Sequence, residues 1–154
     1  MNIAVSESER GDVDPGAITD FIEVVLRAEG VSDDASLAVT FTSVDDIADL
    51  NERFMGKTGP TDVLSFPIED ASPGNPPQAL DGGPPLVLGD IFICNDVVDT
   101  HATEYESSFD EELYLMVVHG VLHILGWDHT DDREAAAMES REATHLATVG
   151  RTRR

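Results

Sequence analysis

The chain has 154 residues, of which 41% are hydrophobic, and this is the size of a single domain with its own core. Cys94 is the only cysteine, so an internal disulfide is excluded and a small buried hydrophobe is expected there. Acidic residues outnumber basic ones by 31 to 9, and a formal net charge of −22 repels polyanions at long range.

The first half of the chain alternates strand and helix patterns. In chain order we expect a strand at 2–6, a helix from Pro15 to the closing Gly30, a strand at 36–42, and a helix opened by Ser43 that runs through Phe54. Asp14 can cap the first helix. Pro15 suits the first helical position, because its missing N–H would have no partner there. Ser43 followed by Asp46 resembles a capping box.

The second half begins with strands and ends in helices. We expect strands at 62–68 and 87–95, a mobile Pro- and Gly-rich surface loop at 70–85, and helices at 96–103, from a cap at Ser107 or Ser108 to Gly126, and at 131–149. The stretch 113–125 is apolar on all sides, which indicates a buried central helix. It is too short to span a bilayer and no signal peptide pattern is visible, so we expect a cytoplasmic protein with no membrane partner.

Three histidines cluster around the end of this central helix. His119 and His123 share one helix face with Cβ atoms about 5–6 Å apart, so both imidazoles can reach one ion. Gly126 can turn the chain and let His129 return as a third ligand. Three protein ligands leave the fourth position of a zinc ion open, which is typical of a catalytic site that lowers the pKa of water toward about 7. The spacing therefore predicts one zinc ion per chain.

The alternative is that these are ordinary core or surface histidines. Three of the five histidines fall in this one short segment at ligand spacing, which favours the metal site. His101 and His145 have no such neighbours, so we expect both at the surface. The spacing equals that of the metzincin proteases, but Gly120 stands where those proteases carry a glutamate base. The ligands of a zinc hydrolase are therefore present without the peptidase base.

These patterns together predict one metal-dependent hydrolase domain over residues 1–154. We expect the α+β class, with a mixed four-stranded sheet and about five helices packed around the buried central helix that carries the metal ligands. Residues 151–154, which include three arginines, are expected to form a flexible tail that either contacts RNA or is simply solvated.

The motif His-Gly-x-Leu-His-x-x-Gly-x-Asp-His at 119–129 resembles that of the YbeY family of metal-dependent endoribonucleases. Segments 60–67, Pro-Thr-Asp-Val-Leu-Ser-Phe-Pro, and 88–91, Leu-Gly-Asp-Ile, are similar to two further family signatures, and Leu-Asn at 50–51 also fits. The match runs in order from about residue 37 to 145. The resemblance implies a single-strand-specific, zinc-dependent endoribonuclease. It also implies maturation of the 3′ end of 16S ribosomal RNA and ribosome quality control, with the small subunit or its assembly proteins as partners.

One position departs from the family pattern. Many members carry an arginine where this chain has Met55, and Arg53 and Lys57 flank that position. Either base could supply the missing charge, so both are candidate catalytic residues. Because only a few bases are available, we expect the positive potential to be local, made by Arg53, Lys57 and the zinc ion, with a shallow salt dependence of RNA binding.

Several other polar residues have two interpretations. Asp128 could orient a ligand histidine, which makes it a candidate catalytic residue, or it could serve only the turn. Asp62 and Asp90 could hydrogen-bond near the site or belong to turns and strand ends. Ser65 could contact a phosphate or be structural.

Three functions compete at this point. The first is an RNA phosphodiesterase, and the second is a zinc hydrolase of another class such as a peptidase, which Gly120 disfavours. The third is a non-catalytic ribosome assembly factor with a structural zinc, which the open fourth metal position disfavours.

Overall fold

Every expected strand and helix is present in the computed structural model, which describes residues 1–154, and element ends lie within about two residues of those expected. In chain order the elements are β1 (Asn2–Val5), α1 (Pro15–Ala28), β2 (Ala35–Phe41), α2 (Val44–Met55), β3 (Val63–Pro67), β4 (Leu86–Ile93), α3 (Asn95–Glu104), α4 (Phe109–Ile124) and α5 (Asp132–Ala147). The α+β class and the number of elements are confirmed.

Side-chain caps fix where the helices begin. The Asp14 carboxylate accepts a hydrogen bond from the Ala17 N–H at 3.1 Å, and the Ser43 hydroxyl accepts one from the Asp46 N–H at 3.1 Å. Ser108, rather than Ser107, caps the central helix. These bonds satisfy N–H groups that have no partner inside the first helical turn.

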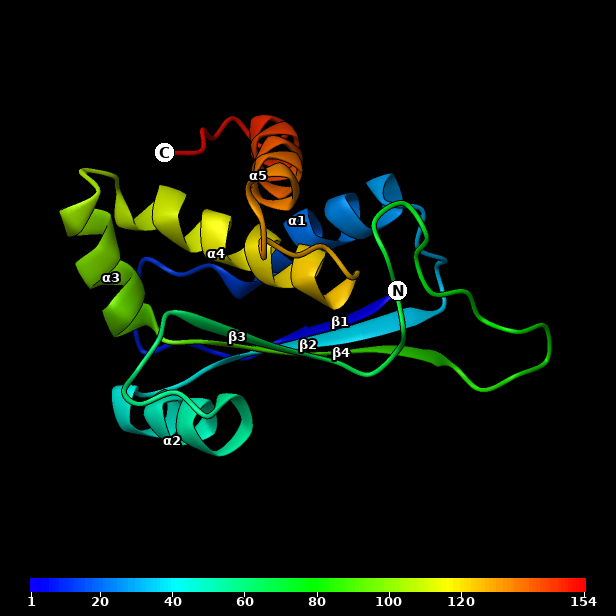
Figure 1. Ribbon diagram of the computed structural model, residues 1–154, viewed down its shortest axis with the longest axis horizontal. Coiled ribbons are helices and arrows are strands. Elements are labelled where there is room, and N and C mark those ends of the chain that lie inside the picture. Colours follow the sequence, from blue (N-terminus) through cyan, green and yellow to red (C-terminus); the bar gives the residue numbers. More distant parts are fainter.

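The sheet is mixed, with strand order β1-β2-β4-β3. Strand β2 pairs parallel with β1 and with β4, whereas β3 pairs antiparallel with β4 and forms one edge. Figure 1 shows α2 on one face of the sheet and α1, α4 and α5 on the other. The sheet is therefore covered on both sides, and β3 runs close to the central helix α4.

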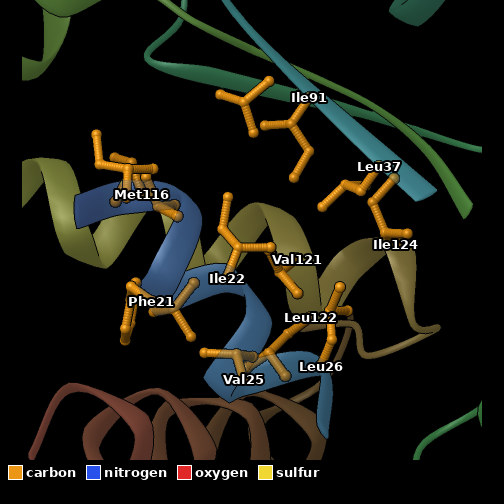
Figure 2. Packing of buried hydrophobic residues seen from close by; sticks show 14 of the residues in the cluster. Phe21, Ile22, Val25, Leu26, Leu37, Ile91, Met116, Val121, Leu122 and Ile124 are labelled. Atoms are coloured by element: carbon orange, nitrogen blue, oxygen red, sulfur yellow. The ribbon is translucent and has the colours of Figure 1, made fainter. Parts of the chain in front are cut away.

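The main core lies between the sheet and helices α1 and α4. Helix α4 contacts α1, α3, α5, β3 and β4, which confirms it as the buried central helix. Figure 2 shows Ile22 and Leu26 of α1 beside Val121 and Leu122 of α4, with Leu37 and Ile91 of the sheet above them in the view. A smaller core beneath α2 contains Ile47, Leu64 and Cys94, so the expected burial of the cysteine is confirmed.

The connection between β3 and β4 contains the expected loop 70–85. It has no helix or strand apart from an isolated bridge between Ser72 and Asn75, and its mobility stays a prediction. No helix of the chain combines the length and the apolar character needed to cross a bilayer.

Candidate metal centre

Helix α4 and the turn after it bring the three predicted ligands together. The Nε2 atoms of His119 and His123 lie 3.0 Å apart on one helix face. Gly126 has φ +93°, which reverses the chain direction and returns His129 to within 5.4 Å of His119 and 5.0 Å of His123 between ring centroids. One ring nitrogen from each histidine lies within 4.8 Å of the other two, as required for three ligands of one ion.

The outer nitrogens of two rings have hydrogen-bond acceptors. His123 Nδ1 lies 2.8 Å from the carbonyl oxygen of Trp127, and His119 Nδ1 lies 2.8 Å from the Glu142 carboxylate. A carbonyl oxygen only accepts, so His123 carries its hydrogen on Nδ1 and keeps an Nε2 lone pair. The carboxylate of Glu142 favours the same tautomer in His119.

Two unprotonated nitrogens at 3.0 Å repel each other unless a cation lies beside both. In a tetrahedral zinc site with Zn–N bonds of about 2.0–2.1 Å, neighbouring ligand nitrogens are about 3.3 Å apart. The observed separation and the neutral donor set therefore fit a bound metal ion.

The environment keeps His123 available for a metal. Burial, reinforced by the positive charge that His119 can carry, lowers the pKa of His123 from 6.5 to about 4. The ring is therefore neutral at physiological pH, and protons do not compete with a metal for its Nε2.

The histidines form one wall of a cavity of about 280 Å³ between α2, β3 and α4. Its lining consists of Asn51, Met55, Lys57, Thr61, Asp62, Val63, Leu64, Ser65, His119, His123 and His129. The segment 60–67, the end of α2 and the three histidines thus meet at one place, although they are separate in the sequence.

Gly120, at the position of the metzincin base, is closely packed against the sheet. A Cβ atom at this position would lie 3.0 Å from Ile91 Cγ2 and 3.2 Å from Ser65 Oγ. The Ser65 hydroxyl in turn donates to the Gly120 carbonyl oxygen at 3.1 Å. A side chain at 120 would therefore require Ile91 and Ser65 to shift, and Ser65 has a structural hydrogen bond.

Comparison with known proteins agrees with this geometry. The family model described as Endoribonuclease YbeY matches residues 6–150. The chain belongs to the YbeY family. It is 39% identical to Endoribonuclease YbeY of Salinispora tropica over 99% of both chains, and 40% identical to that of Staphylococcus aureus over 88% of this chain and 86% of the relative. The solution structure of TM1509 from Thermotoga maritima matches with a TM-score of 0.64 and 27% identity, covering 93% of this chain and 85% of the other.

The structure separates the two bases that flank Met55 in this YbeY protein. Lys57 and Met55 line the cavity, whereas Arg53 does not. The Arg53 side chain is 64% exposed and its guanidinium pairs with Asp49 at 3.3 Å. Lys57 is therefore the base that the fold places beside the three histidines.

Asp128 lies next to a ligand but bonds to the backbone. It is exposed, and its carboxylate accepts a hydrogen bond from the His129 N–H at 2.8 Å, which shapes the turn. The carboxylate that contacts a ligand ring is Glu142 of α5 instead. Sequence reasoning missed Glu142, although its spacing of four residues from Met138 and from Leu146 places it on the buried face of that helix.

Asp62 lies in the cavity, whereas Asp90 is exposed on β4 and is not part of it. Asp62 accepts a hydrogen bond from the Val63 N–H at 2.8 Å, and its other oxygen lies 3.0 Å from His101 Nδ1. Asp62, His101 and Glu112 form a second cluster of potential ligand atoms, but Arg154 already holds both oxygens of Glu112.

The expectation of a surface position for His145 is wrong. Its side chain is buried on the inner face of α5, with Nε2 3.6 Å from the carboxylate of Glu29. Burial lowers the pKa of His145, although the charge of Glu29 opposes that shift. Helical spacing from Met138 and Glu142 would have placed this histidine correctly, whereas its polar character suggested the surface.

Proposed function

We propose that this YbeY protein is a zinc-dependent endoribonuclease specific for single-stranded RNA, and that it matures the 3′ end of 16S ribosomal RNA and acts in ribosome quality control. Family membership makes the chain an endoribonuclease, a hydrolase of RNA phosphodiester bonds. The choice of zinc, the strand preference, and the small subunit or assembly proteins as partners are the parts that we infer.

The observation that carries the metal proposal is the convergence of three imidazole nitrogens on one wall of a cavity. His119, His123 and His129 would hold the ion, and imidazole donors without thiolates or carboxylates suit zinc. When bound, zinc supplies Lewis-acid stabilisation of phosphoryl oxygens and lowers the pKa of water.

The chain's own residues would place the substrate against this centre. The Lys57 ammonium, in the same cavity, is suited to contact a phosphate beside the scissile bond. Asp62 presents a carboxylate in the same cavity, and His101 Nδ1 lies 3.0 Å from one of its oxygens. Glu142 and the Trp127 carbonyl keep the two helical imidazoles in one orientation.

The size of the cavity supports a preference for single strands. About 280 Å³ lies at the lower limit of pockets that hold small ligands, so it fits one nucleotide rather than a stacked pair. The backbone of a stiff duplex would stay outside the cavity, whereas a flexible single strand can bring one phosphodiester to the histidines.

The proposal is tested by metal analysis and cleavage assays on the same preparations. Protein purified without chelator should contain one zinc per chain, and it should cut single-stranded RNA but neither duplex RNA nor casein. His123→Ala should lose both metal and cleavage, whereas His101→Ala, outside the three-histidine cluster, should retain the metal. Cleavage of casein, or undiminished RNA cleavage by metal-free His123→Ala, would contradict the proposal.

The ribosomal role needs a separate substrate. Precursor small-subunit particles should be cut at the 3′ end of their 16S RNA by the parent protein and not by His123→Ala. If free single-stranded RNA is cut while these particles remain intact, the nuclease proposal stands and the ribosomal role fails.

A further inference from the structure

The last residues of the chain, expected to form a flexible tail, make ion pairs through three arginines. In Figure 1 this segment turns back from α5 above α4. Arg151 binds Asp110 at 2.6 and 3.1 Å, and Arg154 binds Glu112 at 2.7 and 3.1 Å. Arg153 binds Glu142 at 3.0 Å. The arginines of this segment thus bond to α4 and α5, and its flexibility stays a prediction.

Glu142 links this segment to the candidate metal centre. Its side chain is only 1% exposed, and its two oxygens have different partners. Oε2 lies 2.8 Å from His119 Nδ1, and Oε1 accepts a hydrogen bond from Arg153 Nε at 3.0 Å. A buried carboxylate is retained only when it is paired and hydrogen-bonded, and Arg153 is the cation that pairs with it.

We propose that Arg153 is a positioning residue of the metal centre, acting through Glu142 on the orientation of His119. The inference rests on the proposed function in taking His119 as a metal ligand. Residue 153 lies beyond the match of the family model, which ends at residue 150. Arg153 also borders a cavity of about 260 Å³ together with His119 and His129, on the side of the histidines that faces α5.

Each of the three nitrogens of the Arg153 guanidinium has an acceptor within 3.5 Å. Besides Nε, the guanidinium reaches Glu139 through Nη2 at 3.5 Å and donates to the Arg154 carbonyl oxygen through Nη1 at 2.9 Å. Three acceptors around a planar fork hold the Glu142 carboxylate at a fixed angle, whereas a lysine ammonium could serve only part of this set.

The test compares metal affinity in Arg153→Gln, Arg153→Lys and Arg151→Gln, measured by competition of zinc with a chromophoric chelator. Arg151→Gln is the matched control, because Arg151 also binds a carboxylate, Asp110, but that carboxylate is 52% exposed and touches no histidine. Cobalt(II) absorption spectra of each variant report the ligand geometry without requiring activity.

Arg153→Gln should bind zinc on the order of 10-fold more weakly, the lower end of effects seen when partners of metal ligands are removed. Arg153→Lys should recover part of that loss, and Arg151→Gln should bind like the parent. In a Glu142→Gln background, Arg153→Gln should cause no further loss, because the two residues act as one unit.

Equal weakening by Arg151→Gln would show that loosening the segment is enough, and would overturn the assignment to Arg153. Parent-like affinity and an unchanged cobalt spectrum in Arg153→Gln would overturn it as well. A full additional loss in the Glu142→Gln background would show that Arg153 acts by another route. A parent protein that binds no zinc would instead refute the proposed metal centre itself.

Discussion

Replacing Lys57 by glutamine should remove most of the salt dependence of RNA binding. Of the nine basic residues, seven arginines are paired with carboxylates, which leaves Lys57 and Arg133 without an ion-pair partner. Of these two, only Lys57 borders the cavity that contains the histidines. We therefore expect about one phosphate contact in the cavity.

One contact sets the magnitude of the effect. Each phosphate neutralised on a single strand contributes about −0.7 to the slope of log affinity against log salt. The parent protein should therefore bind about threefold more weakly when salt rises from about 50 to 200 mM, and Lys57→Gln should show almost no change.

Fluorescence anisotropy of a labelled single-stranded RNA, with metal-free protein to prevent cleavage, measures this slope. Arg53→Gln is the matched control, since Arg53 is exposed, paired with Asp49 and outside the cavity. It should keep the parent slope. The reasoning is refuted if Arg53→Gln and Lys57→Gln have equal effects, or if the parent slope is several times steeper.

Three further outcomes can be measured on stability. Zinc at 100 times its dissociation constant should stabilise the fold by about 2.7 kcal/mol, so chelation should lower the melting temperature. Identical melting curves with and without chelator would mean that the site is empty or plays no part in folding. In metal-free protein the pKa of His123 is lower in the folded than in the unfolded chain, so the unfolded chain takes up the proton at a higher pH. The free energy of unfolding should therefore fall as pH drops below 6.5 toward 4, by at most about 2 kcal/mol between pH 7 and 5. Chemical denaturation at several pH values should show this loss in the parent and less of it in His123→Gln, and equal losses would exclude His123 as the cause. Gly126→Ala should destabilise by more than the roughly 1–2 kcal/mol expected from positive φ alone, because its Cβ would lie 2.2 Å from the Ala71 carbonyl oxygen. Gly56→Ala, at φ +65° with nothing within 4 Å, should cost only the backbone term, and equal losses for the two variants would contradict the close approach.

The sequence by itself determined the elements and the three-histidine cluster, because both depend on short-range geometry. Hydrophobic periods and caps such as Asp14 act over a few residues. The helices and strands that they favour locally are the ones present in the fold. His119 and His123 lie one helical turn apart, and Gly126 lies just beyond, so their convergence with His129 required no knowledge of the rest of the chain.

Only the tertiary structure decided which distant groups complete the site. His119 and Glu142 are 23 residues apart, Asp62 and His101 are 39 apart, and Arg154 and Glu112 are 42 apart. No local period connects such pairs, since they meet only when α4 is covered by α5 and flanked by β3. The choice of Lys57 over Arg53, the burial of His145 and the ion pairs of the last arginines follow from the same packing. Buried carboxylates on α4 and α5 require cations, and the fold supplies them from the end of the chain.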